Sequence, residues 1–435
     1  MPTLTSPASG ASGNVGFRPS EQKGLWVKLL WLHMMGDPQS RRKSVVQLEK
    51  MLLRQRDNHE VLIWDIHAGS PRWLREVKWD GIFLGPSFLW SRFAEGLPMK
   101  KKFEWVSDSQ ATKVALPQDE YDSPRVLDNW LSEWGVNLLV SIFPDHSDVL
   151  YPKLKSGKTR FIKGFTGFVS ENIIEAAGRH LAKPRGIDIF YRAHTISPRY
   201  GELGRLKEEI ARQVTTSSER SESHLTIDIS TRLEDTLFGA SWYEKLADSR
   251  YTLSVPSGSS LIDLFGNLGQ ALSANPELSP EGMLSVDGVI SRELAALSPR
   301  HLEAAVFETA QIALEGSYEG ALTPGTNALL LHRDFSNMED VMETLRDETL
   351  RQEIALGAKE TVLSNPLFRL ENFSRKLVEL ISENRVSRQS RDSSDTQWPK
   401  TFKKATRAQS RAWNVTYFRR TLGRVARKLK LIPAK

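Results

Sequence analysis

At residues 298–309 the chain reads SPRHLEAAVFET, and the apolar run QIAL follows at 311–314. Ser298 is a favourable N-cap residue and Pro299 suits the first position of a helix, so the pattern predicts a helix over Pro299–Thr309. The apolar run after it has the length and composition of a buried strand. A helix that leads directly into a buried strand is typical of a parallel α/β sheet.

Short apolar runs alternate with helical patterns on both sides of this stretch. The predicted strands are Val27–His33, Glu60–Ile66, Asp80–Leu84, Lys113–Leu116, Val136–Phe143, Ile187–Tyr191, Leu225–Ile229, Tyr251–Val255, Gln311–Leu314 and Ala328–Leu331. The alternation favours parallel sheets with helices on both faces. It runs in two blocks of comparable size, joined by a connecting region near 165–185. We therefore expect an α/β protein with two facing Rossmann-like domains and a ligand cleft between them.

The expected organisation has four parts. Residues 1–23 are rich in Ser, Gly, Pro and Thr, which predicts a disordered lead-in. The two Rossmann-like domains are expected over 24–180 and 181–384. A basic tail that contains an amphipathic helix is expected over 385–435. Loops that directly follow strands are the places to search for a site, because ligands bind beyond the carboxyl ends of parallel strands.

Composition excludes several kinds of protein. The chain has 435 residues and no cysteine, so disulfides and cysteine-ligated metals are excluded. The sequence contains no run of about 18 apolar residues, so we expect no membrane-spanning helix. The N-terminus lacks the basic-then-apolar pattern of a signal peptide. We therefore expect a cytoplasmic protein, attached peripherally to the inner face of the membrane if its tail binds lipid.

The charge is distributed unevenly along the chain. Residues 385–435 hold 15 Lys and Arg and two Asp, a net charge of +13, whereas residues 1–384 hold 44 basic and 51 acidic residues, a net charge of −7. An acidic body argues against specific binding of nucleic acid. The asymmetry indicates a separate partner for the tail.

An apolar stripe with helical spacing runs along the end of the tail, surrounded by Arg and Lys. Its members are Val415, Phe418, Leu422, Val425, Leu429 and Ile432. A basic amphipathic helix suits an anionic membrane surface. Two other interpretations stay open: the helix docks on the acidic body of the protein, or the tail is disordered and binds polyanions without specificity.

Two loops after predicted strands combine small residues with polar groups. Arg192 begins the loop after the predicted strand Ile187–Tyr191. Gly201 lies in that loop, and Gly204 and Lys207 lie in the first turn of the predicted helix Gly204–Val214. Glycines and cations at a helix N-terminus predict a phosphate site. The alternative is an ordinary glycine-bearing turn with solvated charges.

Ser257, Gly258 and Ser259 follow the strand Tyr251–Val255, where small residues allow a ligand to approach the backbone. The same residue types also make a plain turn.

Glu303 lies in the second turn of the helix that begins at Pro299, close to the carboxyl edge of the second sheet. A carboxylate there can accept hydrogen bonds from both hydroxyls of a ribose. Arg300 lies three residues earlier on the same helix face. The alternative to a nucleotide site is an Arg300–Glu303 ion pair within the helix.

With these elements the chain resembles glycosyltransferases of the GT-B fold, and in particular uncharacterised bacterial glycosyltransferase-like proteins, including those similar to spore-maturation glycosyltransferases. The segments that carry the resemblance are SPRHLEAAVFETAQIALEGSYEGAL from 298, LLLHRDFSN at 329–337, PQDEY at 117–121 and the stretch YR to GELGRLK at 191–207. The resemblance implies an acceptor-side N-terminal domain and a C-terminal domain that binds a nucleotide sugar. One feature departs from the family pattern: eight positions before Glu303, where many members carry a second glutamate, this chain has Ala295.

The resemblance implies transfer of a sugar from a nucleotide-sugar donor to an acceptor hydroxyl, in surface polysaccharide or glycolipid synthesis. The catalytic base is then expected in the N-terminal domain, where Asp119 and Glu120 follow a strand. Asp65, His67 and His33 also lie at or just after strand ends, and a structural role is the alternative for each. No Asp-x-Asp element stands at a suitable strand end, so neither a metal nor another cofactor is expected, the nucleotide sugar being a substrate.

Two other functions stay open. The missing glutamate allows a nucleotide-sugar-binding protein that has lost catalysis. A nucleotide-sugar epimerase shares the two-domain architecture, although its catalytic carboxylates and histidines cannot be placed. A Gly-rich dinucleotide fingerprint is absent after the first strand, where HMMGD at 33–37 offers one glycine. Neither a Walker-type loop nor a Gly-x-Ser-x-Gly elbow occurs.

Overall fold

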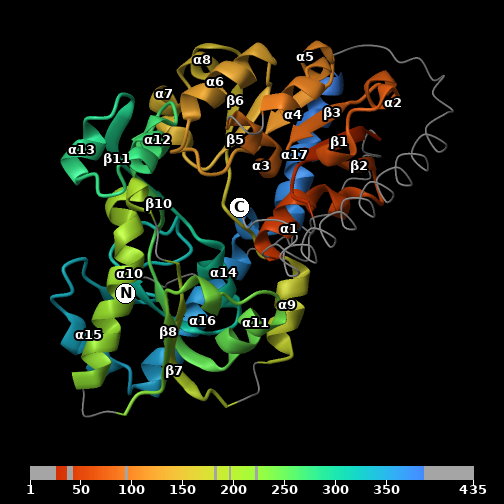
Figure 1. Ribbon diagram of the computed structural model, residues 1–435. Coiled ribbons are helices and arrows are strands. Elements are labelled where there is room, and N and C mark those ends of the chain that lie inside the picture. The colour runs from red at the N-terminus through yellow and green to blue at the C-terminus, as the bar shows by residue number, and fades with distance from the viewer. Residues whose placement is uncertain are drawn as a thin grey trace, which may run out of the picture.

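The computed structural model describes residues 26–36, 43–93, 97–180, 184–194, 197–220 and 224–386. These residues form two α/β domains, one above the other in Figure 1. The expected lead-in and nearly all of the expected basic tail lie outside the described residues. Their disorder and their amphipathic helix therefore stay predictions.

The N-terminal domain is built on a six-stranded sheet whose neighbouring strands are all parallel. Its strands are β1 (Lys28–His33), β2 (Glu60–Asp65), β3 (Gly81–Leu84), β4 (Thr112–Ala115), β5 (Leu138–Ser141) and β6 (Arg160–Lys163). The spatial order is β2-β1-β3-β4-β5-β6. The chain thus extends the sheet first on one side of β1 and then on the other. The loops after β1 and β3 diverge at this reversal, which is where open α/β sheets bind ligands.

Helices cover both faces of this sheet, because most of its strand residues are buried and apolar. They are α1 (Lys43–Glu49), η2 (Met51–Gln55), η3 (Ile66–Ala68), α2 (Arg72–Glu76), α3 (Pro86–Leu89), η4 (Trp90–Arg92), α4 (Leu97–Lys102), α5 (Trp105–Asp108), α6 (Pro124–Glu133), η6 (Pro144–His146), α7 (Ser147–Leu150), α8 (Pro152–Ser156) and α9 (Glu171–Gly178).

The C-terminal domain repeats the plan with a five-stranded sheet of order β13-β12-β9-β7-β8, again parallel. Its strands are β7 (Ile187–Arg192), β8 (Ile227–Ser230), β9 (Ser249–Ser254), β12 (Ala310–Leu314) and β13 (Leu329–Leu331). Its helices are η7 (Pro198–Tyr200), α10 (Gly201–Arg220), η8 (Leu233–Asp235), α11 (Ala240–Ala247), α14 (Pro299–Val306), α15 (Met338–Thr344), α16 (Glu348–Ser364), η9 (Pro366–Phe368) and α17 (Leu370–Val386). In this sheet β8 lies on one side of β7 and β9 on the other, so the direction in which the chain adds strands reverses between β7 and β9. The predicted class, two facing Rossmann-like domains, is confirmed.

Every strand predicted from the sequence is present, with ends shifted by at most two residues. The sequence analysis missed β6, which lies just before the connecting region. It also missed an antiparallel hairpin of β10 (Ser257–Asp263) and β11 (Val289–Ala296), with α12 (Asn267–Ala274) and α13 (Pro280–Leu284) between the two strands.

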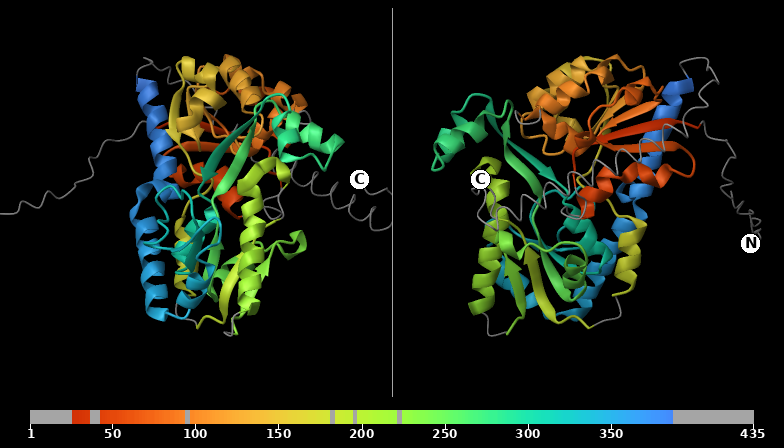
Figure 2. Two further views of the ribbon diagram at one scale, coloured as in Figure 1. Left: turned by 90° about the vertical axis from the view of Figure 1, so that its left-hand side faces the viewer. Right: turned by 45° about the vertical axis from the view of Figure 1, so that its right-hand side comes forward.

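The β10–β11 hairpin leaves the C-terminal domain and reaches the N-terminal one (Figure 2). The backbone N–H of Asp263 donates to the carbonyl of Tyr121 at 2.8 Å, and the N–H of Ser123 donates to the carbonyl of Asp263 at 2.7 Å. Ile262 and Leu294 of the hairpin are buried in the core of the N-terminal domain. The hairpin therefore fixes how the two domains sit relative to each other.

Helix α17 connects the domains a second time. Although it is the last described helix of the sequence block that forms the C-terminal domain, it packs on η2 of the N-terminal domain (Figure 1). The amide of Gln55 donates to the hydroxyl of Ser374 at 2.9 Å, and Ile381 packs against Gly81. The predicted boundary near 180 falls between α9 and β7, and the boundaries as a whole stay predictions.

Candidate functional site

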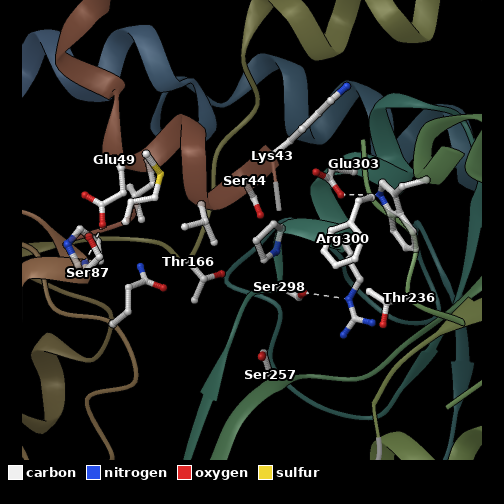
Figure 3. Close-up of a pocket in the computed structure, with 18 of the residues that line it drawn as sticks. Lys43, Ser44, Glu49, Ser87, Thr166, Thr236, Ser257, Ser298, Arg300 and Glu303 are labelled. Atoms are coloured by element: carbon white, nitrogen blue, oxygen red, sulfur yellow. Dashed lines mark hydrogen bonds between the residues drawn. The ribbon is translucent and has the colours of Figure 1, made fainter. Parts of the chain in front are cut away.

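A cavity of about 780 Å³ lies between the two domains, at the reversals of both sheets. From the N-terminal domain it is lined by Met34 and Met35 after β1 and by Ser87 after β3. From the C-terminal domain it is lined by Arg192 at the end of β7 and by Ser257 after β9. Figure 3 shows Glu49 and Ser87 on one side of this space and Arg300 and Glu303 on the other.

Glu303 occupies the buried end of the C-terminal side. Helix α14 starts at Pro299, as predicted, and carries Glu303 into the cavity wall with 7% of its surface exposed. The indole Nε1 of Trp242 donates to Glu303 Oε2 at 2.8 Å (Figure 3). Burial raises the pKa of Glu303 to about 7, although the Trp242 bond and the positive charges of Arg300 and Lys43 oppose the rise.

Arg300 projects into the cavity beside Glu303 (Figure 3). Its guanidinium donates to the main-chain carbonyl of Arg192, and its Nε lies 3.5 Å from the hydroxyl of Ser298. Among the described residues, Arg300 and Glu303 do not form the ion pair that the sequence analysis left open. Both side chains therefore face the space where a ligand would lie.

Arg192 also lines the cavity, but the protein holds most of its guanidinium. It pairs with the carboxylate of Asp228 and donates to the carbonyls of Asp228, at 2.8 Å, and Asp235, at 3.2 Å. Its role is therefore partly to order the loop after β8. Lys207 of α10 reaches the same wall with 7% of its surface exposed.

Four of the small residues predicted to bind the donor lie outside the cavity lining, and only Ser257 is part of it. Gly201 has φ 61° where α10 begins, and Gly204 is buried in that helix. Gly258 has φ 111°, and a Cβ there would lie 1.9 Å from the carbonyl oxygen of Leu294. Ser259 donates to the carbonyl of Leu261 at 2.6 Å. The geometry of these residues indicates that they allow or stabilise the local backbone conformation.

The two predicted catalytic carboxylates of the N-terminal domain point in different directions. Asp119 lines the cavity, has φ 52° and accepts a hydrogen bond from the hydroxyl of Tyr121 at 2.6 Å. Glu120 is fully buried and is not part of the lining. It accepts hydrogen bonds from the Ser141 hydroxyl, at 2.7 Å, and the Ile142 N–H, at 2.6 Å. Burial raises the pKa of Glu120 to about 7.

His67 and Asp65 form a pair at the carboxyl end of β2. Nδ1 of His67 lies 2.8 Å from Oδ1 of Asp65, which also caps η3 by accepting the backbone N–H of His67 at 3.0 Å. His67 lines the cavity with 37% of its side chain exposed, whereas Asp65 is buried. Burial alone would raise the pKa of Asp65, but the bond from His67 and the nearby His33 outweigh it and lower that pKa. His33 is buried and lies outside the cavity lining.

The sequence analysis missed several cavity residues. Lys43 at the start of α1 reaches across to the C-terminal domain, where its ammonium lies 4.6 Å from the centre of the Tyr243 ring. Glu49 is fully buried and accepts from Nε1 of Trp31 at 2.9 Å. Trp90 is 47% exposed. Lys43, Trp90 and Trp242 all lie on helices, α1, η4 and α11, and none of them directly follows a strand, so a search of strand ends does not find them.

No group of three or more His, Asp or Glu among the described residues could hold a metal ion. None of the helices in the described ranges is both long and apolar enough to cross a membrane.

Comparisons with known proteins give similarity in structure alone. No protein-family model and no curated protein matches the chain. Among solved structures it is similar to HepE of Anabaena in complex with UDP-glucose, with 11% identity, a TM-score of 0.47, and 82% of this chain and 100% of that one covered. Sucrose-phosphate synthase of Thermosynechococcus elongatus matches with 12% identity, a TM-score of 0.48, and coverage of 83% and 100%. An α-glucosyltransferase in complex with UDP and a DNA 13-mer matches with 12% identity, a TM-score of 0.47, and coverage of 82% and 99%.

Proposed function

We propose that this protein is a glycosyltransferase, which transfers a sugar from a nucleotide-sugar donor to the hydroxyl of an acceptor. The observation that carries the proposal is the composition of the one cavity at the two sheet reversals. Glu303 and Arg300 face it from the C-terminal domain. His67, whose ring is held by the buried Asp65, and Asp119 face it from the other domain. An anion-binding wall opposite a wall with proton acceptors suits group transfer between two bound substrates.

The C-terminal wall suits the donor. Glu303 is placed to accept hydrogen bonds from ribose hydroxyls, and the Trp242 bond holds its carboxylate in position. Arg300 and Lys207 supply positive charge beside it, which a diphosphate requires. Their charge would also stabilise the nucleoside diphosphate as it leaves. Arg192 supports this wall through the carbonyl that it offers to Arg300.

The N-terminal wall suits the acceptor. In the proposed reaction the acceptor oxygen attacks the anomeric carbon, the bond from that carbon to the diphosphate breaks, and the diphosphate leaves with the bonding electrons. His67 takes the hydroxyl proton on Nε2, because Asp65 holds its Nδ1. Asp119 is the alternative base, but the Tyr121 hydroxyl already occupies one of its carboxylate oxygens. Glu120 lies too deep in the N-terminal domain for this role in our proposal.

A single displacement of this kind inverts the anomeric centre. The equivalent of the second glutamate is Ala295, and the nearby Glu293 forms an ion pair with Arg333, N–O distance 2.8 Å, outside the cavity. The chain thus offers no second carboxylate on the α14 side of the cavity, within the described residues, that could assist a retaining reaction. We therefore propose an inverting enzyme that needs no metal or other cofactor.

Measurements of nucleotide binding test the proposed donor site. Calorimetry with UDP, GDP, ADP and CMP and their common sugar conjugates should find one nucleotide family that binds to the wild type. The same ligand should bind much more weakly to Glu303→Ala, with circular dichroism and thermal unfolding showing an intact fold. If none of the nucleotides binds, or if Glu303→Ala binds equally well, the proposed donor site is wrong.

We also propose a saccharide or glycolipid acceptor in polysaccharide synthesis, reached from the cytoplasmic face of a membrane. The support is the basic amphipathic pattern of the tail from Val415 to Ile432. Co-sedimentation with anionic and neutral vesicles, for the full chain and a chain ending at Asn384, tests this. Equal sedimentation of both chains with anionic vesicles would exclude the membrane role.

A further inference from the structure

We propose that Trp90 is a stacking platform for an uncharged sugar ring of the acceptor, so that the acceptor class is a neutral saccharide and not an anionic one. The inference rests on the proposed function, whose acceptor it specifies. It is drawn from the exposure of Trp90, from the way its backbone is held and from the charge of the wall around it.

Trp90 is the first residue of η4 and lines the cavity with 47% of its surface exposed. Two more of the exposed large apolar side chains of the described residues line the same cavity: Val45 of α1, at 40%, and Phe238 before α11, at 51%. An indole that is half exposed to water loses much of the free energy that its burial would contribute. Its exposure inside a cavity therefore indicates that a ligand covers it. The C–H face of a pyranose ring is the apolar surface that fits a flat indole in a hydroxyl-binding site.

The backbone that carries Trp90 is rigid because Arg92, two residues later in the same helix η4, is buried and hydrogen-bonded. The guanidinium of Arg92 donates to the carbonyl of Asp122 at 3.0 Å and to those of Gln118 and Asp119 at 3.3 Å. Only 4% of Arg92 is exposed. One buried cation therefore fixes the turn that carries Trp90 and the loop that carries Gln118 and Asp119.

Polar groups that bind hydroxyls lie beside the platform. Gln118 and Asp119, held by Arg92, both line the cavity, as does His67. An amide and a carboxylate next to an aromatic face can accept and donate the hydrogen bonds of a sugar ring, while the indole covers its apolar face. The arrangement would place the reactive hydroxyl on the side of the His67–Asp65 pair.

The charge of this wall argues for a neutral acceptor. Among the described residues that line the cavity from the N-terminal domain, Lys43 is the only Lys or Arg, and its ammonium lies over the Tyr243 ring of the other domain. Asp119 on the same wall is acidic. A phosphate or carboxylate on the acceptor ring would meet this carboxylate, while the Lys43 ammonium, the one cation that the described residues place on this wall, is engaged by the Tyr243 ring; both are unfavourable for an anion.

Saturation-transfer NMR on the full chain tests the platform. The probes are methyl glycosides of glucose, galactose, mannose and N-acetylglucosamine, mixed with the anionic glucuronic acid and glucose 6-phosphate. We expect saturation of at least one neutral glycoside by the wild type, strongest at the ring C–H protons. Trp90→Ala should reduce it about fivefold, as loss of an aromatic contact does, and Trp90→Phe should retain most of it.

Trp26→Ala is the matched control, since Trp26 is 56% exposed and lies outside the cavity lining. Its spectra should equal those of the wild type. Equal saturation in Trp90→Ala and wild type, saturation of the anionic probes alone, or no saturation of any probe would overturn the platform. Nucleotide titration of the same samples separates the two claims: glycosides that bind at Trp90 without any nucleotide binding would refute the donor site and leave the platform standing.

Discussion

Trp242 and Glu303 lie 61 residues apart in the chain, yet the indole Nε1 of one donates to a carboxylate oxygen of the other at 2.8 Å. The bond joins α11 to α14 at the wall of the cavity. It leaves Glu303 oriented toward the ligand space although the residue is almost fully buried.

At pH 8, above the raised pKa of Glu303, its carboxylate is charged, so Glu303→Gln should weaken nucleotide binding about 10-fold or more, as expected when a charge-assisted hydrogen bond from ribose is lost. Trp242→Phe should weaken it less, since the carboxylate stays and only its orientation is loosened. Titration calorimetry gives both dissociation constants. An affinity lowered more by Trp242→Phe than by Glu303→Gln would contradict the ribose contact.

Arg300 and Arg192, the two arginines of the donor wall, should differ in their effect on the stability of the protein. Arg300→Met should lower nucleotide affinity by about 10-fold with little change in stability, because its guanidinium has few partners in the protein. Arg192→Met should also lower the free energy of unfolding, since it removes the guanidinium bonds to the carboxylate of Asp228 and to the carbonyls of Asp228 and Asp235, leaving Lys245 as the partner of that carboxylate. Urea unfolding beside calorimetry separates the two. Equal loss of stability in both variants would show that Arg300 is structural.

The strand ends and the start of the helix that carries Glu303 could be predicted from sequence, since both follow from local patterns. Apolar runs mark the strands, and the Ser298-Pro299 start marks the helix that carries Glu303. The β10–β11 hairpin could not be predicted in this way. Its strands read SGSSLID and VISRELAA, which lack a regular apolar alternation, and they gain their burial by pairing with each other and with the N-terminal domain. The Trp242 contact likewise depends on tertiary packing.

Glu120 gives a prediction of pH dependence. Burial raises its pKa to about 7, above the ordinary value of 4.5, so the folded state favours the neutral acid. Its contribution to stability is full below pH 4.5 and is lost as pH rises to 7, by up to roughly 3 kcal/mol. Glu120→Gln removes this titration. The free energy of unfolding of wild type minus that of Glu120→Gln should therefore fall between pH 5 and pH 8.

Urea unfolding of both proteins across this range measures that difference directly. The free energies of unfolding of the two proteins are compared with each other because other buried groups titrate as well. Burial raises the pKa of Glu49 and Glu303 to about 7, and lowers that of His33 to about 4. A pH-independent difference between the two proteins would mean that Glu120 is charged in the folded state.

The hairpin that joins the domains should depend on Gly258. A Cβ at this position would lie 1.9 Å from the Leu294 carbonyl oxygen, and φ is 111°. Gly258→Ala should therefore destabilise the protein by about 2 kcal/mol or more, because backbone must move. Gly178→Ala is the control, since no atom lies within 4 Å of its Cβ position. Thermal unfolding of the two variants should differ clearly, and equal midpoints would show that the hairpin tolerates the change.

Sugar transfer itself is tested most directly by mass spectrometry of the acceptor. The nucleotide sugar that binds is incubated with the neutral methyl glycosides and wild-type protein, His67→Ala or Asp65→Asn. We predict a glycoside heavier by one transferred sugar in the wild-type reaction, an inverted anomeric configuration by NMR, and a rate at least about 100-fold lower in His67→Ala. Tight donor binding with no mass-shifted product from any acceptor would contradict the account and indicate a binding protein.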